Sequence, residues 1–168
     1  MLLVTKRGES MKTIVQLDRI DRRILIVLQK NGRIPNVELA KKVNLTPTPC
    51  LERVKRLEKE GFINRYVALV DPLKVSLALC AYIEVQLASS NTAAFKRFNQ
   101  KMRDLPEVQE CQMVAGGFDY LIKIRVADML HYQRFLGEKL ASIEDISQTH
   151  TYVVIDDIKS ETALQIHD

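Results

Sequence analysis

The stretch PNVELAKKVNLTPTPCLERVKRLEKEG, residues 35–61, predicts two helices separated by a tight turn. We expect the first helix to begin at Asn36, because Asn is a preferred N-cap residue. The turn falls at Asn44, and Asn is one of the few residues other than Gly that adopt left-handed backbone at modest cost. The apolar spacing of the first helix predicts four buried side chains: Val37, Leu39, Ala40 and Val43.

The second helix of this stretch has one apolar side and one polar side. Thr46 is placed to cap it, and Pro47 suits its first position, where a backbone N–H has no partner within the helix. The expected apolar side is Leu51, Val54 and Leu57. The opposite side begins with the short hydroxyl of Thr48, and after the carboxylate of Glu52 it continues with the cations Arg53, Lys55, Arg56 and Lys59. This layout is typical of a DNA recognition helix, although two ordinary surface helices would give a similar pattern.

The charge of the chain is divided unevenly between its two parts. The chain has 168 residues, enough for two small domains with separate cores, and its 46% hydrophobic and 27% charged residues are typical of a globular protein. Residues 1–72 contain 15 Lys and Arg against 8 Asp and Glu, a net charge of +7. Residues 73–168 contain 10 against 13, a net charge of −3. The N-terminal part therefore attracts a polyanion such as DNA.

Other classes of function have little support in the sequence. No apolar run approaches the roughly 20 residues that cross a bilayer, so we expect no membrane partner. Cys50, Cys80 and Cys111 are isolated within apolar patterns, which indicates small buried side chains in a reducing cytoplasm. The three His residues are scattered, and neither type is paired as a zinc site requires. Because a phosphate-binding loop and a nucleophile arrangement are also missing, we predict no catalysis, no metal and no cofactor.

A further helix and a β element flank the opening stretch. Asp18 can cap a helix with apolar residues at helical spacing, which ends at Asn31-Gly32. Residues 62–70 are rich in aromatic and β-branched side chains, which predicts one or two strands. Three helices and a short β element make a winged helix-turn-helix, with Asn64 and Arg65 at the tip of the wing. We place this domain at residues 17–72, after a flexible segment at residues 1–16.

The C-terminal part, residues 73–168, changes to alternating patterns with two helices between them. The predicted order is strand, helix, strand, strand, helix, strand, at residues 79–87, 92–105, 108–115, 119–126, 129–143 and 149–158. This order is that of a ferredoxin-like βαββαβ sandwich, an antiparallel sheet with both helices on one face. The fold class is therefore α+β.

The second face of this sheet would be bare in a single chain. Strands that carry Tyr82, Ile124 and Tyr152 are too apolar to be left exposed, and packing against the sheet of a second copy would cover them. We therefore predict a homodimer held by the C-terminal domain.

With both parts in view, the chain resembles the leucine-responsive regulator and asparagine-regulator family of bacterial transcription factors along nearly its whole length. The N-terminal motifs that carry the resemblance are Leu17-Asp-Arg-Ile-Asp21, Asn31-Gly-Arg-Ile34, Thr46-Pro-Thr-Pro-Cys50, Arg53-Val-Lys-Arg-Leu-Glu58 and Gly61-Phe-Ile63. The C-terminal motifs are Gly116-Gly-Phe-Asp-Tyr120 and Thr151-Tyr-Val-Val154. The Thr-Pro-Thr-Pro-Cys form is particularly similar to the leucine-responsive branch.

The resemblance implies an amino-acid site where dimers meet, bordered by the Gly116–Tyr120 hairpin. The implied effector residues are Met113, Gly116, Gly117, Phe118, Asp119, Tyr120, Met129, Tyr152 and Val153. Glycines let backbone amides approach a ligand carboxylate, Asp119 can pair with its ammonium, and the methionines can line a pocket for an aliphatic side chain. Gly117 stands where the leucine-responsive member has an acidic residue. The residues alone favour a simple tight turn with a capping Asp over a ligand site.

For DNA, the expected contacts are Asn36, Thr46, Pro47, Thr48, Pro49, Glu52, Arg53, Lys55, Arg56 and Arg65. Thr46, Thr48 and Pro49 would lie near base edges, and Arg53 would reach a base or a phosphate. Lys55, Arg56 and Arg65 would mainly neutralise phosphates.

We therefore expect a cytoplasmic, nucleoid-associated transcription regulator that binds double-stranded DNA sequence-specifically. Its dimers would assemble to an octamer or larger, and its oligomeric state and operator binding would respond to leucine, methionine or a similar amino acid. Two alternatives are a ligand-independent architectural DNA-binding protein, and an amino-acid enzyme or enzyme regulatory subunit.

Overall fold

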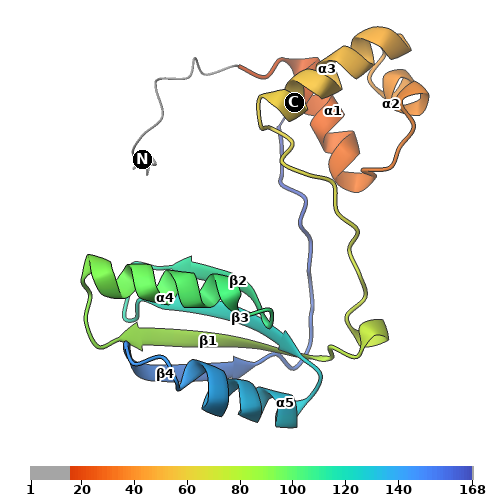
Figure 1. Cartoon of the computed structure of the whole chain (residues 1–168). Coiled ribbons are helices and arrows are strands. Elements are labelled where there is room, and N and C mark those ends of the chain that lie inside the picture. The colour runs from red at the N-terminus through yellow and green to blue at the C-terminus, as the bar shows by residue number, and fades with distance from the viewer. Residues whose placement is uncertain (1–15, 168) are drawn as a thin grey trace. The chain divides into compact units, whose positions relative to one another are not determined.

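The computed structural model describes residues 16–167, which form two compact units (Figure 1). The first unit combines the chain up to Ala68 with the segment from Glu161 onward, and the second runs from Leu69 to Ser160. The sequence places residues 73–168 in one C-terminal domain, so the return of residues 161–167 to the first unit is a finding of the structure. The predicted flexible segment, residues 1–16, lies outside the described residues apart from Gln16.

Three helices make up most of the first unit: α1 at Arg19–Lys30, α2 at Asn36–Lys42 and α3 at Pro47–Lys59. Helix α1 begins where predicted. Asp18 accepts a hydrogen bond from the Asp21 N–H, and the Asp21 carboxylate accepts one from the Asp18 N–H, which satisfies two backbone donors at once. The core of the unit consists of Ile24, Leu25, Leu39, Ala40, Val43, Cys50 and Leu57.

The structure confirms the turn after α2 and corrects two details of that helix. Asn44 has a φ of 57°, the left-handed backbone that was predicted. Asn36 is the first helical residue and Pro35 is the N-cap, so the Asn36 amide Nδ2 donates to the Pro47 carbonyl (2.8 Å) instead. Val37, predicted to be buried, is 50% exposed. This helix has only seven residues, of which Leu39 and Ala40 are buried.

Helix α3 begins with Pro47 after Thr46, as predicted, although the Thr46 hydroxyl caps no described N–H. Its inner side is formed by Cys50, Val54 and Leu57. Leu51, predicted to lie on that side, is 42% exposed. Because successive helical residues are rotated by about 100°, burial of Cys50 turns Leu51 outward.

The strands expected at residues 62–70 are not found in the part of the chain that the structure describes. A strand needs a neighbour for its backbone hydrogen bonds, and this segment has no ladder partner there. The segment still occupies the place of a wing after α3. Ile63 packs against the helical core, and Tyr66 Oη donates to Glu58 Oε1 (2.9 Å).

The C-terminal segment completes the first unit. The Leu164 N–H donates to Gln29 Oε1 (2.6 Å), and Gln29 Nε2 donates back to the Leu164 carbonyl (3.2 Å). Ile166 packs against the helical core, whereas the side chain of Leu164 is 76% exposed. The segment is therefore held through the Leu164 backbone and the Ile166 side chain.

The second unit has the predicted βαββαβ order. After a short 3-10 turn, η1 at Leu73–Val75, its elements are β1 at Leu79–Leu87, α4 at Thr92–Asp104, β2 at Val108–Met113, β3 at Tyr120–Val126, α5 at Met129–Arg134 with a π-helical continuation η2 at Phe135–Leu140, and β4 at Ile146–Val153. The strands form one antiparallel sheet in the order β2-β3-β1-β4. Strand β4 was predicted at residues 149–158 and ends earlier, because Val153 pairs with Ala81 near the start of β1 and little partner strand lies beyond.

Both helices cover the same face of this sheet, as predicted. The buried core between the helices and the sheet consists of Ala81, Ile83, Val85, Leu87, Ala94, Phe98, Met102, Tyr120, Ile122, Ile124, Phe135, Leu140 and Ile143. Ile124 belongs to this buried face, so its assignment to the open face was wrong. It alternates in phase with Tyr120 and Ile122. On the open face, Tyr82 lies directly opposite Tyr152, which is 55% exposed.

Candidate nucleic-acid interface and effector site

The outward side of α3 is the first candidate site. Thr46, Pro47 and Thr48 are exposed at its start, and an exposed stripe with helical spacing follows: Thr48, Glu52, Lys55 and Lys59. Leu51 joins this side, and the sequence analysis missed it. Its position three residues after Thr48 and four before Lys55 was the available signal. The face offers hydroxyls, a carboxylate, an apolar side chain and cations to a partner.

Three other predicted DNA contacts lie outside this stripe. Pro49 and Asn36 are partly buried, and the amide of Asn36 ties the start of α2 to the start of α3. Arg65 is exposed in the segment after α3.

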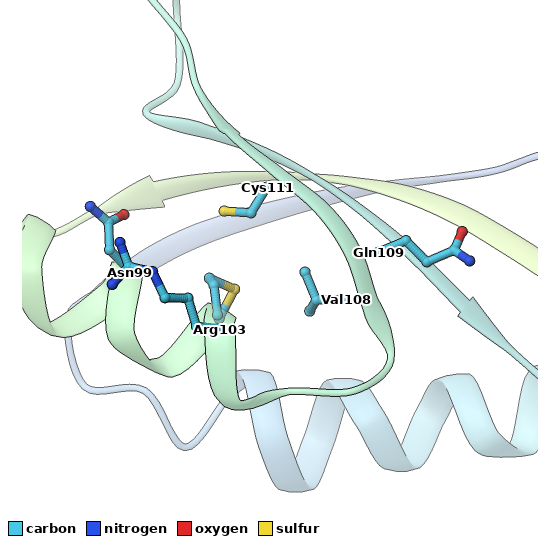
Figure 2. Close-up of a pocket in the computed structure, with 6 residues that line it drawn as sticks. Asn99, Arg103, Val108, Gln109 and Cys111 are labelled. Atoms are coloured by element: carbon cyan, nitrogen blue, oxygen red, sulfur yellow. The ribbon is translucent and has the colours of Figure 1, made fainter. Parts of the chain in front are cut away.

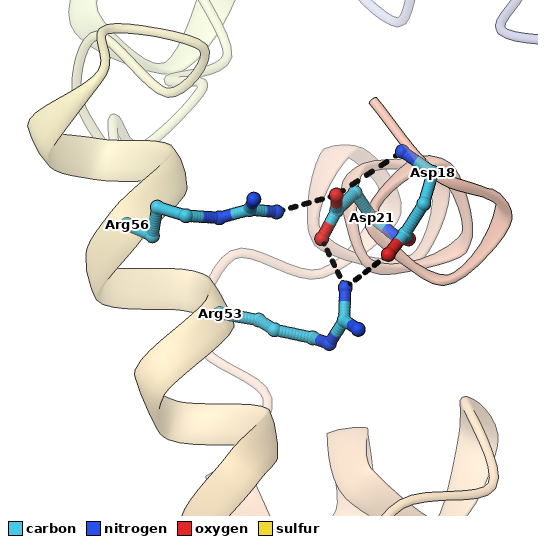
Figure 3. Close-up of polar contacts among 4 residues, drawn as sticks. All are labelled: Asp18, Asp21, Arg53 and Arg56. Atoms are coloured by element: carbon cyan, nitrogen blue, oxygen red, sulfur yellow. Dashed lines mark hydrogen bonds and ion pairs between the residues drawn. The ribbon is translucent and has the colours of Figure 1, made fainter. Parts of the chain in front are cut away.

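Arg53 and Arg56 are turned inward, toward α1 (Figure 3). Arg53 Nη1 donates to Asp18 Oδ2 (2.6 Å) and Asp21 Oδ1 (2.8 Å), and Arg56 Nη2 donates to Asp21 Oδ2 (2.5 Å). Their side chains are only 30% and 39% exposed. Two of the cations expected to contact DNA are thus engaged within the unit, and a DNA-binding role for them stays a prediction.

These ion pairs act on the ionisation of Asp18 and Arg53. Burial alone would raise the pKa of the Asp18 carboxyl, but hydrogen bonds from the Asp21 amide and from Arg53 outweigh it and hold that pKa below its ordinary value. Hydrogen bonds to Asp18 and Asp21 raise the pKa of Arg53. Asp18 and Arg53 are therefore both charged at neutral pH.

The effector candidates fall into two groups at opposite ends of the sheet. Met113 and the residues up to Tyr120 lie at one end, because Tyr120 pairs with both Met113 and Val85. Tyr152 and Val153 lie at the other, since Val153 pairs with Ala81. Along β1, Ala81 and Val85 are four residue steps apart, which is roughly 13 Å at 3.3 Å per residue.

The hairpin between β2 and β3 is anchored to β1 by Asp119. Its N–H donates to the Val85 carbonyl (3.0 Å), and its Oδ2 accepts a bond from the Leu87 N–H (2.7 Å). Gly116 and Gly117 are exposed, and a Cβ at either position would meet no atom within 4 Å. The hairpin is thus fixed at its base and open at its tip.

A hollow of about 260 Å³ lies beside this tip, on the open face of the sheet. Gly117 and Phe118 line it together with four residues that the sequence analysis missed: Glu84, Gln86, Gln148 and His150. Glu84 pairs with His150, and Gln86 with Gln148, across β1 and β4. The alternation of β1, with Tyr82 and Glu84 outward, was the signal that could have found them.

Comparison with known proteins matches both parts of the chain. Residues 17–64 match the family model of a winged helix-turn-helix DNA-binding domain, and residues 80–164 match that of the Lrp/AsnC ligand binding domain. The chain is 49% identical over 150 residues to the leucine-responsive regulatory protein of Escherichia coli (strain K12), which covers 89% of this chain and 92% of that protein. The chain belongs to the Lrp/AsnC family. The predicted family and the predicted two-part α+β architecture are thereby confirmed.

Solved structures of Lrp/AsnC regulators have the same fold. The transcriptional regulator NMB0573 of Neisseria meningitidis, solved as an L-Met complex, is 38% identical with a TM-score of 0.86, over 89% of this chain and 97% of that one. AsnC of E. coli is 26% identical with a TM-score of 0.81, over 88% of this chain and 97% of that one.

A further hollow of this Lrp/AsnC chain, about 310 Å³, lies between α4 and β2 (Figure 2). Asn99 and Arg103 reach it from α4, and Val108 and Cys111 from β2, while Gln109 extends away from them. It contains none of the predicted effector residues. Burial raises the pKa of the Cys111 thiol to about 11, so that thiol is protonated at neutral pH and is a poor nucleophile.

Within residues 16–167, no three His, Cys, Asp or Glu side chains are grouped so that they could hold a metal ion. Among the described helices, none is both long and apolar enough to span a membrane.

Proposed function

We propose that this chain is a sequence-specific transcription regulator that binds double-stranded DNA through the outward side of α3 and responds to a small amino acid. The observation that carries this is the exposed start of α3, where hydroxyls precede cations on one helical face of a winged helix-turn-helix. Such a helix start is the part that reaches base edges in the major groove. We place the protein in the cytoplasm, associated with the nucleoid.

The DNA contacts divide by position on this face. Thr46 and Thr48 can donate and accept hydrogen bonds at base edges, and exposed Leu51 can contact a thymine methyl group. Lys55 and Arg65 neutralise phosphates. We give Glu52 and Pro47 supporting positions on the same surface. Arg53 and Arg56 are left out of these contacts, because Asp21 already holds both.

Leucine or methionine is the proposed effector. The relatives include a protein named for its response to leucine and a regulator solved with L-Met. In this chain, Gly116 and Gly117 leave room for a ligand carboxylate to approach backbone amides. Met113 and Met129 are about half exposed and supply apolar surface for an aliphatic side chain.

We propose that the effector site is completed by a second protomer. The two groups of effector candidates lie too far apart along β1 for one amino acid to touch both. Pairing of open sheet faces around Tyr82 and Tyr152 would form a dimer, and contacts between dimers would bring hairpin tips to neighbouring chains. Assembly to an octamer or larger follows from such repeated contacts.

A gel-shift assay on genomic fragments, run over a range of salt concentrations with a panel of amino acids, tests this function. We expect a subset of fragments to be bound preferentially and leucine or methionine to change that binding. Binding that follows DNA bendability and ignores every amino acid would indicate the architectural alternative. Lack of DNA binding would favour an enzyme regulatory role and refute the proposal.

Sedimentation of the purified protein tests the assembly. We expect a dimer or larger species at low micromolar concentration and a redistribution among oligomers with leucine or methionine, because a ligand shifts an equilibrium only by its difference in affinity for the two states. A monomer, or a distribution that neither amino acid changes, would contradict this part.

A further inference from the structure

Asp21 is the one charged side chain that is fully buried in the described part of the chain. It lies in the first turn of α1, and its carboxylate faces α3 (Figure 3). Oδ1 accepts a bond from Arg53 and Oδ2 accepts one from Arg56. The two arginines are three residues apart on one side of α3, so a single carboxylate holds two successive points of that helix.

Asp18, at the start of α1, is hydrogen-bonded both to Asp21 and to Arg53. Asp18 and Asp21 cap each other's backbone N–H, and Asp18 Oδ2 adds a second bond to Arg53. A buried carboxylate that loses its cationic partners is strongly destabilised. Asp21 therefore requires α3 to be rotated so that Arg53 and Arg56 point toward α1.

This requirement determines which side of α3 faces outward. With the arginines turned to α1, Thr48 and Lys55 face solvent. Rotation of α3 about its own axis would displace those side chains sideways at the level of the bases, where hydrogen bonds tolerate only small errors of position.

We propose that Asp21 is a positioning residue for DNA recognition: it fixes the rotation of α3 and holds Arg53 and Arg56 away from the DNA phosphates. This role presupposes DNA binding through the outward side of α3, as proposed. Asp21 contacts no DNA and acts only through the two arginines.

Charge and position predict opposite effects for Asp21→Asn. The substitution removes one negative charge from a basic unit, so charge alone would strengthen binding to any duplex. Loss of positioning would weaken binding to the preferred sequence only. The ratio of the two affinities therefore separates the two effects.

The test uses the full chain and two fluorescent duplexes: one selected from random sequence with the wild-type protein, and a scrambled version of it. We expect Asp21→Asn to lower the affinity ratio, selected over scrambled, at least tenfold, while affinity for the scrambled duplex is unchanged or higher. An unchanged ratio would overturn the role of Asp21. So would an equal loss on both duplexes, which would mean that Asp21 only maintains the fold.

A matched pair of α3 variants tests the arginines separately. Lys55 makes no ion pair with another described residue, so Lys55→Gln should reduce the slope of log affinity against log salt by about 0.9, the value for one lost phosphate contact. Arg56→Gln should leave that slope unchanged. If Arg56→Gln reduces the slope as Lys55→Gln does, Arg56 is a phosphate contact and the inference is wrong.

Circular dichroism of each variant shows whether it is folded at the assay temperature. Should Asp21→Asn be unfolded, the comparison of Arg56→Gln with Lys55→Gln decides the matter. If the selection enriches no sequence, the proposed regulator function itself fails, which is a different outcome from an unchanged ratio.

Discussion

The C-terminal segment should contribute measurably to the stability of the DNA-binding unit. The double variant Gln29→Ala/Ile166→Ala removes both hydrogen bonds to the Leu164 backbone and the side chain that packs against the helical core. Each exposed hydrogen bond contributes about 0.5 kcal/mol, at the lower end of the usual range. Loss of a partly buried Ile side chain costs about 1–2 kcal/mol. The free energy of unfolding of the first unit should therefore fall by about 2–3 kcal/mol.

Differential scanning calorimetry measures this directly. For a domain of 60–100 residues, about 1 kcal/mol lowers Tm by roughly 4–8 °C, so we expect the transition of the first unit to fall by roughly 8–24 °C. The transition of the second unit should not move, because no residue of its core is changed.

Leu164→Ala is the matched control. Its side chain is 76% exposed and its bonds to Gln29 come from the backbone, so it should cost less than about 0.5 kcal/mol. A double variant that melts like the wild type would refute the reasoning. So would a Leu164→Ala variant as unstable as Ile166→Ala alone.

Three further outcomes follow from single side chains. The pKa of Asp18 is lowered in the folded state, so the stability that its carboxylate contributes is complete above the ordinary pKa of 3.8 and is lost as pH falls through the lower folded pKa. Between pH 7 and pH 3, the urea midpoint should therefore fall less in Asp18→Asn than in the wild type. Asn44 has a φ of 57°, so Asn44→Val should destabilise the first unit by about 1–2 kcal/mol while Asn44→Gly stays near neutral, as read from urea unfolding. Phe98 is fully buried and its ring centre lies 4.4 Å from that of Tyr120, so Phe98→Ala should cost the second unit about 3–5 kcal/mol by thermal melting, and a loss below 1 kcal/mol would contradict the packing.

Local signals predicted the regular elements well. Asp18 marked the start of α1, because a cap is a short-range structure that the local sequence records; its reciprocal bonding with Asp21 was added by the structure. Strand β1 has the predicted bounds. Its residues alternate between the open face, where Tyr82 lies, and the buried face, where Ile83 lies, and this alternation is visible in the sequence. Strand β4 was misplaced because its end depends on the length of the strand beside it.

The direction of the arginines on α3 could not be predicted from charge. A Lys or Arg opposite an apolar stripe is usually solvated, and only a buried acid on a neighbouring helix reverses that expectation. Asp21 was noted in the sequence only as part of the Leu17–Asp21 motif, and its contact with Arg56 spans 35 positions of chain. The docking of the C-terminal segment could not be predicted for the same reason. Its contact from Leu164 to Gln29 spans 135 positions, and no periodic pattern in the sequence indicates it.

The C-terminal segment also sets an order of events during synthesis. Residues 69–160 are continuous in sequence, so the second unit can fold as soon as they have left the ribosome. The first unit emerges earlier but lacks Ile166 and the Leu164 backbone until translation has passed both residues. The first unit should therefore reach full stability only after every residue of the second unit has been synthesised.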